Sequence, residues 1–310
     1  MAFSELRVIS LIPGATETLA ALGLIDALVG RSHECDYPPV VKQCPICTQS
    51  KLDTSAPSGQ IHDDVTKLLQ SALSIYQIDI AKLEELQPTH ILTQAQCDVC
   101  AVTLSDVEQA VAQLTQSSPK VISLQPNLLA DVWTDMQRVA EALGVDAEAA
   151  IANLQARVER CQQQTHSAPE HPTVACIEWT EPLMVAANWV PELVELAGGR
   201  DMLGVTGHSP RLEWQVLVEA DPEIIIFMPC GFDLERTRQE ALKLTHRPEW
   251  QNLQVAQTGK VYFTDGNQYF NRPGPRLVDS LEVLAEILHP DTCHFGYEGT
   301  GWEQIQAKVT

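Results

Sequence analysis

Residues 7–24 read RVISLIPGATETLAALGL and set out the pattern that decides the fold. Arg7–Leu11 is a short apolar run typical of a buried strand, and Pro13 and Gly14 form a turn. Thr16–Leu24 then has the spacing of a short helix that ends at Gly23. The same order of strand, polar loop and helix returns along the chain. It predicts an α/β fold with mostly parallel sheets covered by helices on both faces.

The pattern is interrupted once and then restarts. Residues 128–164 have apolar positions every three to four residues and no buried-strand run, which predicts one long kinked helix or two consecutive helices. Strand-like runs lie before this stretch at His90–Thr93 and Val121–Leu124, and after it at Thr173–Ile177 and Ile224–Phe227. The chain therefore reads as two Rossmann-like lobes joined by a helical spine.

The length of the chain fits this division. With 310 residues, of which 45% are hydrophobic, the chain can bury two cores. We expect an N-terminal α/β lobe over residues 1–126, a connecting helix over residues 127–165 and a C-terminal α/β lobe over residues 166–310.

The charge and the cysteines bear on partners and location. Lys and Arg number 20 against 41 Asp and Glu, and the net charge of −21 opposes binding to nucleic acid or to anionic lipid. No apolar run approaches the ~18 residues that cross a bilayer, and residues 1–12 do not have the pattern of a secretory signal. The nine cysteines are an odd number, so reduced thiols are the default. We expect a cytoplasmic protein with no membrane insertion.

A polar cluster marks the expected binding site. Gly30–Tyr37 reads GRSHECDY and follows a strand, at the end of the sheet where open α/β folds place ligands. Other polar or aromatic segments, among them QAQCDVC at 94–100 and PCGF at 229–232, follow strands in the same way. We expect these segments to line a site between the lobes. The candidate ligand-binding residues are His33, Glu34, Cys35, Tyr37, Gln94, Cys97, Glu178, Trp179, Trp189, Cys230, Gly231, Tyr269 and Arg272.

Thiol and imidazole groups leave a bare-metal site as an alternative. Cys97 and Cys100 form a C-x-x-C pair after a strand, and with His33 or Cys35 they supply ligands that zinc or iron accepts. A second C-x-x-C pair, at residues 44 and 47, is either part of a joint four-cysteine site or unrelated. This alternative is a metal-binding protein or metalloenzyme that uses His33, Cys35, Cys97 and Cys100. A third is an interaction protein that has kept the fold and lost the ligand.

Catalysis has no positive signal in the sequence. There is no P-loop, no G-x-G-x-x-G, no G-x-S-x-G and no H-E-x-x-H motif. Nothing resembles a Ser–His–Asp arrangement. We therefore expect a binding protein and not an enzyme.

Several segments together resemble a known family. They are RVISLIPGATETLAALGL, LQPTHILTQAQC, WVPELVELAGG, LVEADPEIIIFMPCGF, RPEWQNLQVAQTGKVYFTDG and GPRLVDSLEVLAEILHP. Over about residues 6–290 the chain is similar to the periplasmic binding proteins of iron-siderophore and vitamin B12 transport, in the branch labelled cobalamin-binding or ABC-transporter substrate-binding protein.

The resemblance implies a class III periplasmic-binding-protein fold, a helical-backbone metal receptor in which a long helix joins the lobes. It implies a ligand such as a corrinoid, a ferric chelate, haem or a bare metal, and an ABC permease as partner. Glu17, in the segment PGATE, matches the first-helix pattern and is the candidate for docking onto the permease. We expect a non-enzymatic protein that holds a cobalamin-like corrinoid or related metal chelate between its lobes, with His33 or a cysteine as the axial ligand.

Overall fold

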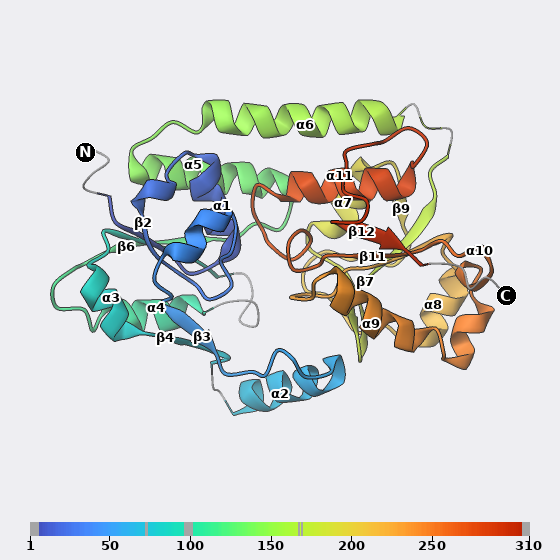
Figure 1. The fold of residues 1–310 in the computed structure, drawn as a ribbon, viewed down its shortest axis with the longest axis horizontal. Helices are drawn as coiled ribbons and strands as arrows, with labels where there is room; N and C mark the ends of the chain where they lie inside the picture. The colour runs from blue at the N-terminus through green and yellow to red at the C-terminus, as the bar shows by residue number, and fades with distance from the viewer. Residues whose placement is uncertain (1–5, 72–73, 96–101, 167, 169, 306–310) are drawn as a thin grey trace.

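The computed structural model describes residues 6–71, 74–95, 102–166, 168 and 170–305. Two sheets lie side by side, each in its own lobe, with long helices running across the top of both (Figure 1). The expected two-lobed α/β fold is confirmed. The expected domain limits stay a prediction.

The N-terminal lobe is built on a four-stranded parallel sheet. Its order is β2 (Leu28–Arg31), β1 (Val8–Ser10), β5 (His90–Gln94) and β6 (Lys120–Leu124). Alternate residues of these strands point to opposite faces, as strand geometry requires. One face packs against α1 (Pro13–Ala21) and α5 (Leu129–Leu143), and the other against α3 (Ile80–Leu86) and α4 (Leu104–Val111).

The C-terminal lobe is built on a six-stranded mixed sheet. Its order is β12 (Trp302–Gln304), β11 (Val261–Thr264), β10 (Ile224–Phe227), β7 (Thr173–Thr180) and β8 (Leu183–Val185), with β9 (Arg200–Asp201) also paired to β7. β12 and β8 are antiparallel to their neighbours, and the other pairs are parallel.

Helices cover both faces of this second sheet. One face packs against α6 (Glu148–His166), α7 (Val190–Leu196) and α11 (Leu277–Leu288). The other face packs against α8 (Trp214–Ala220), α9 (Leu234–Leu244), the 3-10 helix η4 (Pro248–Asn252) and α10 (Val255–Thr258).

The spine consists of two helices, α5 and α6. Gly144 ends α5 with a φ of 73°, in the left-handed region that glycine adopts without strain. α6 has 19 residues and therefore a length of about 28 Å. α5 contributes Met136 to the core of the C-terminal lobe and Val139 to the core of the N-terminal lobe. α5 therefore packs into the cores of both lobes and is also part of the segment that connects them.

A small excursion leaves the N-terminal lobe after β2. It contains the 3-10 helix η3 (Pro39–Gln43), the antiparallel pair β3 (Thr48–Ser50) and β4 (Tyr76–Ile78), and α2 (Ser58–Gln70) between them. Another 3-10 helix, η2 (Ile25–Ala27), precedes β2. The sequence predicts a long loop over residues 40–59 and a helix that begins at Asp63, so β3 and the earlier start of α2 at Ser58 are corrections.

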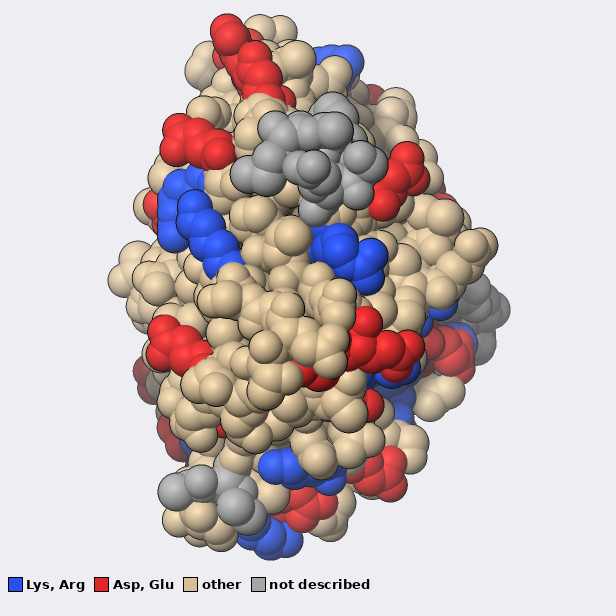
Figure 2. Space-filling view, turned by 90° about the vertical axis from the view of Figure 1, so that its left-hand side faces the viewer, with Lys and Arg blue, Asp and Glu red and all other residues tan. Residues whose placement is uncertain are grey.

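Charged side chains are scattered over one face of the molecule. The face at the N-terminal-lobe end carries acidic and basic side chains interspersed among uncharged ones (Figure 2). Among the described residues, every helix is too short or too polar to traverse a lipid bilayer.

Candidate functional site

Loops that follow strands of one sheet meet loops that follow strands of the other. Gly14 follows β1 and lies against the backbone of Pro273 and Gly274, which follow β11. A Cβ on Gly274 would lie 2.9 Å from the Cα of Gly14, and a Cβ on Gly14 would overlap the carbonyl oxygen of Pro273. Glycine permits this approach because it has no side chain. The carboxyl ends of both sheets therefore face one interlobe seam, the usual place for a ligand in α/β folds.

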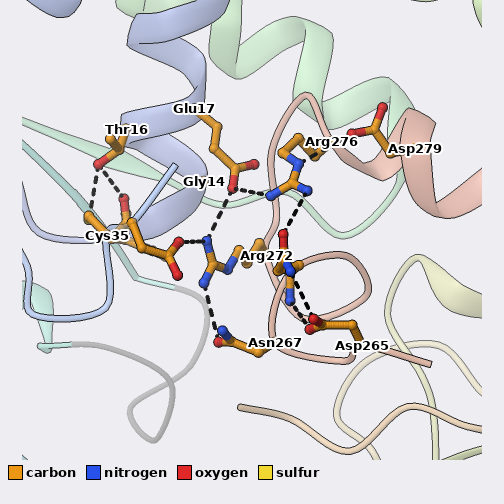
Figure 3. Close-up of polar contacts among 12 residues, drawn as sticks. Gly14, Thr16, Glu17, Cys35, Asp265, Asn267, Arg272, Arg276 and Asp279 are labelled. Atoms are coloured by element: carbon orange, nitrogen blue, oxygen red, sulfur yellow. Dashed lines mark hydrogen bonds and ion pairs between the residues drawn. The ribbon is translucent and has the colours of Figure 1, made fainter. Parts of the chain in front are cut away.

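Four charged side chains join the lobes at this seam, and we call them the interlobe latch: Glu17, Asp36, Arg272 and Arg276. Nη1 of Arg272 lies 2.5 Å from Oδ1 of Asp36 and 3.5 Å from Oε1 of Glu17. Nη1 of Arg276 lies 3.7 Å from the same oxygen of Glu17. Figure 3 shows the Glu17 carboxylate pointing from α1 towards both guanidinium groups. Because buried charges are costly unless paired, separating the lobes here would break several ion pairs at once.

Two tyrosine rings complete the contact around Arg276. Its guanidinium carbon lies 4.1 Å from the ring centre of Tyr37 and 4.8 Å from that of Tyr269. Tyr37 follows β2 in the N-terminal lobe, so its cation–π contact with Arg276 adds attraction between the lobes, whereas Tyr269 follows β11 and holds Arg276 from within its own lobe. The predicted residues Tyr37, Tyr269 and Arg272 are thus brought together by the structure.

The latch acids differ in their affinity for protons. Burial raises the pKa of Glu17 to about 7, in spite of the opposing effect of Arg276 and Arg272. Burial acts in the same direction on Asp36, but its hydrogen bond and ion pair with Arg272 prevail and lower the pKa of Asp36. Oε2 of Glu17 and Nη1 of Arg276 are buried and make no hydrogen bond within the described part of the chain.

His33 lies in the loop after β2 with its ring held in one orientation. Its backbone N–H donates to Oγ1 of Thr48 over 3.1 Å, and its Nδ1 lies 2.8 Å from the same oxygen. The Thr48 hydroxyl donates its own proton to Oγ of Ser32 over 3.2 Å. With this direction of the hydroxyl bond, Nδ1 of His33 is the protonated nitrogen that donates to Thr48, and Nε2 carries the lone pair.

The ring of His33 remains neutral and borders a groove. Burial, and then the nearby charge of Arg31, lower the pKa of His33. The ring packs against Tyr76 at 5.6 Å between centres, and Oε1 of Glu34 is 3.9 Å from Nε2, beyond hydrogen-bond distance. The groove, which we call the His33 groove, has a volume of about 710 Å³ and is lined by His33, Ile46, Thr48, Gln49, Gln77, Ile78, Asp79 and Ile80.

Comparison with known proteins identifies the family to which the chain belongs. A model of the family described as periplasmic binding protein matches residues 8–268. The chain belongs to this family. The vitamin B12-binding protein of Photorhabdus laumondii is 25% identical over 295 residues, which cover 92% of this chain and 89% of that protein. The cobalamin-binding protein of Halobacterium salinarum is 23% identical over 309 residues, covering 92% and 70%.

Solved structures agree on the fold. A periplasmic heme binding protein from Pseudomonas aeruginosa superposes with a TM-score of 0.74 at 18% identity, over 98% of this chain and 99% of that one. The expected family and the class III fold are confirmed. The chain is a solute-binding protein of the periplasmic type and not an enzyme.

Three of the predicted ligand-binding residues are buried or half-buried within the C-terminal or N-terminal lobe. The indole of Trp189 is buried and donates to the carbonyl of Phe270 over 2.8 Å. Gln94 is buried at the end of β5. Glu178 is half-buried and accepts the hydroxyl of Ser209 over 2.6 Å, and the burial of its carboxyl raises its pKa.

The ends of β7 and β10 bring a second group of predicted residues together. The backbone N–H of Cys230 donates to the carbonyl of Glu178 over 3.3 Å. The ring of Trp179 packs against Phe232 at 5.1 Å between centres, and its indole donates to the carbonyl of Glu181. Gly231 has a φ of 76° in the turn between these residues.

The bare-metal alternative finds no support in this periplasmic binding protein. Cys35 is buried, and its sulfur accepts the Thr16 hydroxyl over 3.0 Å. Burial raises the pKa of Cys35 to about 12, so the thiol keeps its proton. Cys97 and Cys100 lie outside the described residues. Within the described ranges, no three His, Cys, Asp or Glu side chains are grouped to hold a metal ion.

Glu17 occupies a different place from the one expected for a docking residue. Its side chain is 1% exposed and faces Arg272 and Arg276 of its own chain. In this structure it is therefore not presented to a permease, because its charge is used between the lobes.

Sequence reasoning did not select Asp36, Arg276 or Thr48 as site residues. Asp36 lies inside the GRSHECDY cluster, and Arg276 is the last residue of the RPGPR segment that begins with Arg272. The sequence pattern could therefore have indicated both residues. Thr48 had no signal, because its importance depends on the return of the chain through β3 past His33.

Proposed function

We propose that this periplasmic binding protein binds a corrinoid, or a related metal chelate, in the His33 groove, with Nε2 of His33 as the axial ligand of the metal. The observation that carries the proposal is the orientation of the ring, whose Nδ1 is held by Thr48. A neutral imidazole with one nitrogen oriented by a hydrogen bond and the other available is the form that binds transition metals.

The lining of the groove suits a flat, partly apolar ligand. Ile46, Ile78 and Ile80 supply apolar surface, and Gln49 and Gln77 supply amide groups. Small-molecule sites commonly have volumes of about 300–1,000 Å³ with a mainly apolar lining and a few polar groups. The groove would hold one face of a macrocycle, with the metal opposite Nε2.

The His33 groove is a better candidate for the ligand site than the interlobe seam at the latch. The sequence predicts a ligand between the lobes, but Glu17 and Arg272 fill the seam at the latch with the chain's own side chains. A ligand there would have to displace buried ion pairs, which are costly to break. The His33 groove requires no such displacement.

The relatives support the ligand class. Two are named for vitamin B12 or cobalamin, which favours a corrinoid. A structural relative is a heme binding protein, so haem is the second candidate, and it would use the same nitrogen of His33.

Absorption spectroscopy tests the proposal. Cobinamide is a suitable probe, because it is a corrinoid without its own nucleotide base and takes any nitrogen ligand from the protein. We expect the wild type to retain cobinamide after desalting with a shifted spectrum, and His33→Ala to lose the shift. A parallel titration with haemin distinguishes the second candidate.

Two further variants sharpen this test. Thr48→Val removes the group that orients the ring, and loss of such a partner should weaken binding by about 10–100-fold. His90→Ala is the matched control, because Nδ1 of His90 also lies near a threonine hydroxyl, that of Thr89 at 3.0 Å, but outside the groove. Equal spectra for the wild type and His33→Ala would contradict the proposal.

The transport role follows from the family as a further proposal. An ABC permease would receive the ligand from this protein, since one relative is named as an ABC transporter substrate-binding lipoprotein. The expected cytoplasmic location stays a prediction.

A further inference from the structure

The lining of the His33 groove has an unequal balance of charge. Among the described residues that line it, Asp79 carries the only formal charge, because the ring of His33 is neutral and the lining contains no lysine or arginine. Gln49 and Gln77 contribute uncharged amides. The polar part of the groove therefore consists of amides, the imidazole and hydroxyl described above, and one carboxylate.

Two cations lie near the groove but are bound to other groups. Arg31 is close enough to lower the pKa of His33, but its guanidinium is buried and donates to two backbone carbonyls of the loop after β2. Lys82 is near Asp79, and its ammonium pairs with Glu85 at 2.5 Å. Proteins recognise carboxylate ligands mainly with guanidinium and ammonium groups. A carboxylate in this groove would meet an acid in place of a cation.

Asp79 is fixed at the edge of the groove by the backbone around it. Its N–H donates to the carbonyl of Cys47 over 2.9 Å. Its Oδ1 accepts the N–H of Lys82 over 2.9 Å, so Asp79 is the N-cap of α3. Within the described part of the chain, its other carboxylate oxygen accepts no hydrogen bond. The negative charge is therefore held in one place and is available to a ligand.

The two glutamines form a bonded pair across the neighbouring strands. Gln49 of β3 lies opposite Gln77 of β4, and Nε2 of Gln49 donates to Oε1 of Gln77 over 3.0 Å. This bond uses one donor and one acceptor, and it leaves an amide oxygen and an amide N–H of the pair without a partner among the described residues. The same holds if both amides are turned over. The pair therefore offers a ligand one acceptor beside one donor.

A primary amide matches this pair, and a carboxylate does not. An amide has its own donor and acceptor, so it can bond to both free groups of the glutamines. A carboxylate has only acceptors, so it would bond to one glutamine and place its charge against the oxygen of the other. Groups that repel the wrong ligand contribute to specificity as much as groups that attract the right one.

We propose that Asp79 and the Gln49–Gln77 pair make the groove selective for a cationic macrocycle with amide side chains, and that they disfavour a macrocycle with carboxylate side chains. Aquacyanocobinamide is a cation with primary amides around its rim, and haemin carries two carboxylates. The selectivity rests on the proposed function for the location of the ligand. It chooses the corrinoid over haem by charge and by hydrogen-bonding pattern.

Asp79→Asn and Asp233→Asn make a matched pair that tests the selection by charge. Both aspartates are N-caps, since Oδ1 of Asp233 accepts the N–H of Arg236 over 2.8 Å, and asparagine caps a helix equally well. We expect the wild type to bind aquacyanocobinamide more tightly than haemin. In Asp79→Asn the ratio of the two affinities should fall about three- to tenfold, and added salt should reduce the ratio in the wild type. Asp233→Asn should keep the wild-type ratio.

Gln77→Leu and Gln116→Leu test the amides in the same way. Oε1 of Gln116 also accepts from a glutamine, that of residue 87, but outside the groove. In Gln77→Leu we expect the affinity for aquacyanocobinamide to fall about three- to tenfold, while the affinity for haemin stays unchanged. Gln116→Leu should match the wild type with both ligands.

The outcomes separate the selectivity from the proposed function, provided that only binding lost in His33→Ala is counted. A wild type that prefers haemin, or a ratio in Asp79→Asn equal to that of the wild type, would overturn the selection by charge. Equal loss of both ligands in Gln77→Leu would overturn the role of the amides. Absence of any binding that depends on His33 would overturn the proposed function and the selectivity with it. Thermal unfolding of each variant shows that the fold is retained.

Discussion

His33 and Cys35 stand two residues apart in one loop, yet their surroundings give them opposite chemistry. Cys35 lies under the loop, where its sulfur accepts from Thr16 and donates to the carbonyl of Ser10, and burial raises the pKa of its thiol to about 12. His33 borders the groove as a neutral ring. At the scale of the residue, the sequence singled out this loop but could not tell which of its side chains would be enclosed.

The latch acid Glu17 should make stability depend on pH. Burial raises its pKa from 4.5 to about 7, so between these values the folded protein keeps a proton that the unfolded chain releases. This contribution to stability is present at low pH and is lost as the pH rises through the range. The loss should reach up to about 3 kcal/mol, measured by urea unfolding between pH 4.5 and 8.

Glu17→Gln isolates this effect, because its side chain stays neutral at every pH. We expect the wild type to lose stability relative to Glu17→Gln as the pH rises through this range. Parallel stability curves for the two proteins would show that Glu17 does not take up a proton on folding.

At the scale of the element, the chain after α11 shows how one buried acid fixes a strand. The carboxylate of Glu286 accepts the backbone N–H groups of Phe295 and Gly296, the N–H of Tyr297 at 3.1 Å, and the indole of Trp302 at 2.8 Å. Trp302 begins β12, which pairs antiparallel with β11. Glu286 thus anchors the edge of the second sheet.

Replacing Glu286 by Gln should destabilise the protein. The amide cannot accept all of these hydrogen bonds, and hydrogen bonds to a charged group contribute about 1.5–3 kcal/mol each. We expect a loss of about 2–4 kcal/mol in the free energy of unfolding, measured by urea denaturation. Glu298→Gln is the control, since Glu298 is exposed, and a loss of equal size in both variants would contradict the anchoring role.

The elements that the sequence predicted are those with a strong apolar pattern. β5 and β10 are wholly buried, and the sequence predicted them from the short apolar runs at residues 90–93 and 224–227. β3, β9 and β12 have two or three residues with a mixed burial pattern, so no period shows in the sequence. These strands depend on pairing with distant residues, which a single sequence does not display.

At the scale of the whole molecule, two different polar contacts join the lobes in addition to the shared helix α5. The latch is charged and buried, and it joins α1 and the loop after β2 to the loop after β11. The second contact is made of hydrogen bonds: Ser58 of α2, in the excursion after β3, bonds to Glu240 of α9 and to Thr180 of β7. The sequence predicted two lobes facing each other, and the family resemblance added the class III fold with a long helix between the lobes. It did not predict that an acid of α1 would be used between the lobes, because Glu17 acquires its partners only when residues 272 and 276 fold against it.

The central claim is that Nε2 of His33 binds the metal of the ligand, and electron paramagnetic resonance tests it most directly. Reduced cobinamide contains Co(II), whose signal is split by a coordinated nitrogen nucleus. Bound to this protein, it should show each line as a triplet, and the triplets should become doublets when histidine carries the heavy isotope of nitrogen. The splitting should vanish in His33→Ala and persist in His90→Ala. A bound cobinamide signal without nitrogen splitting, or one unchanged by the isotope, would contradict the account.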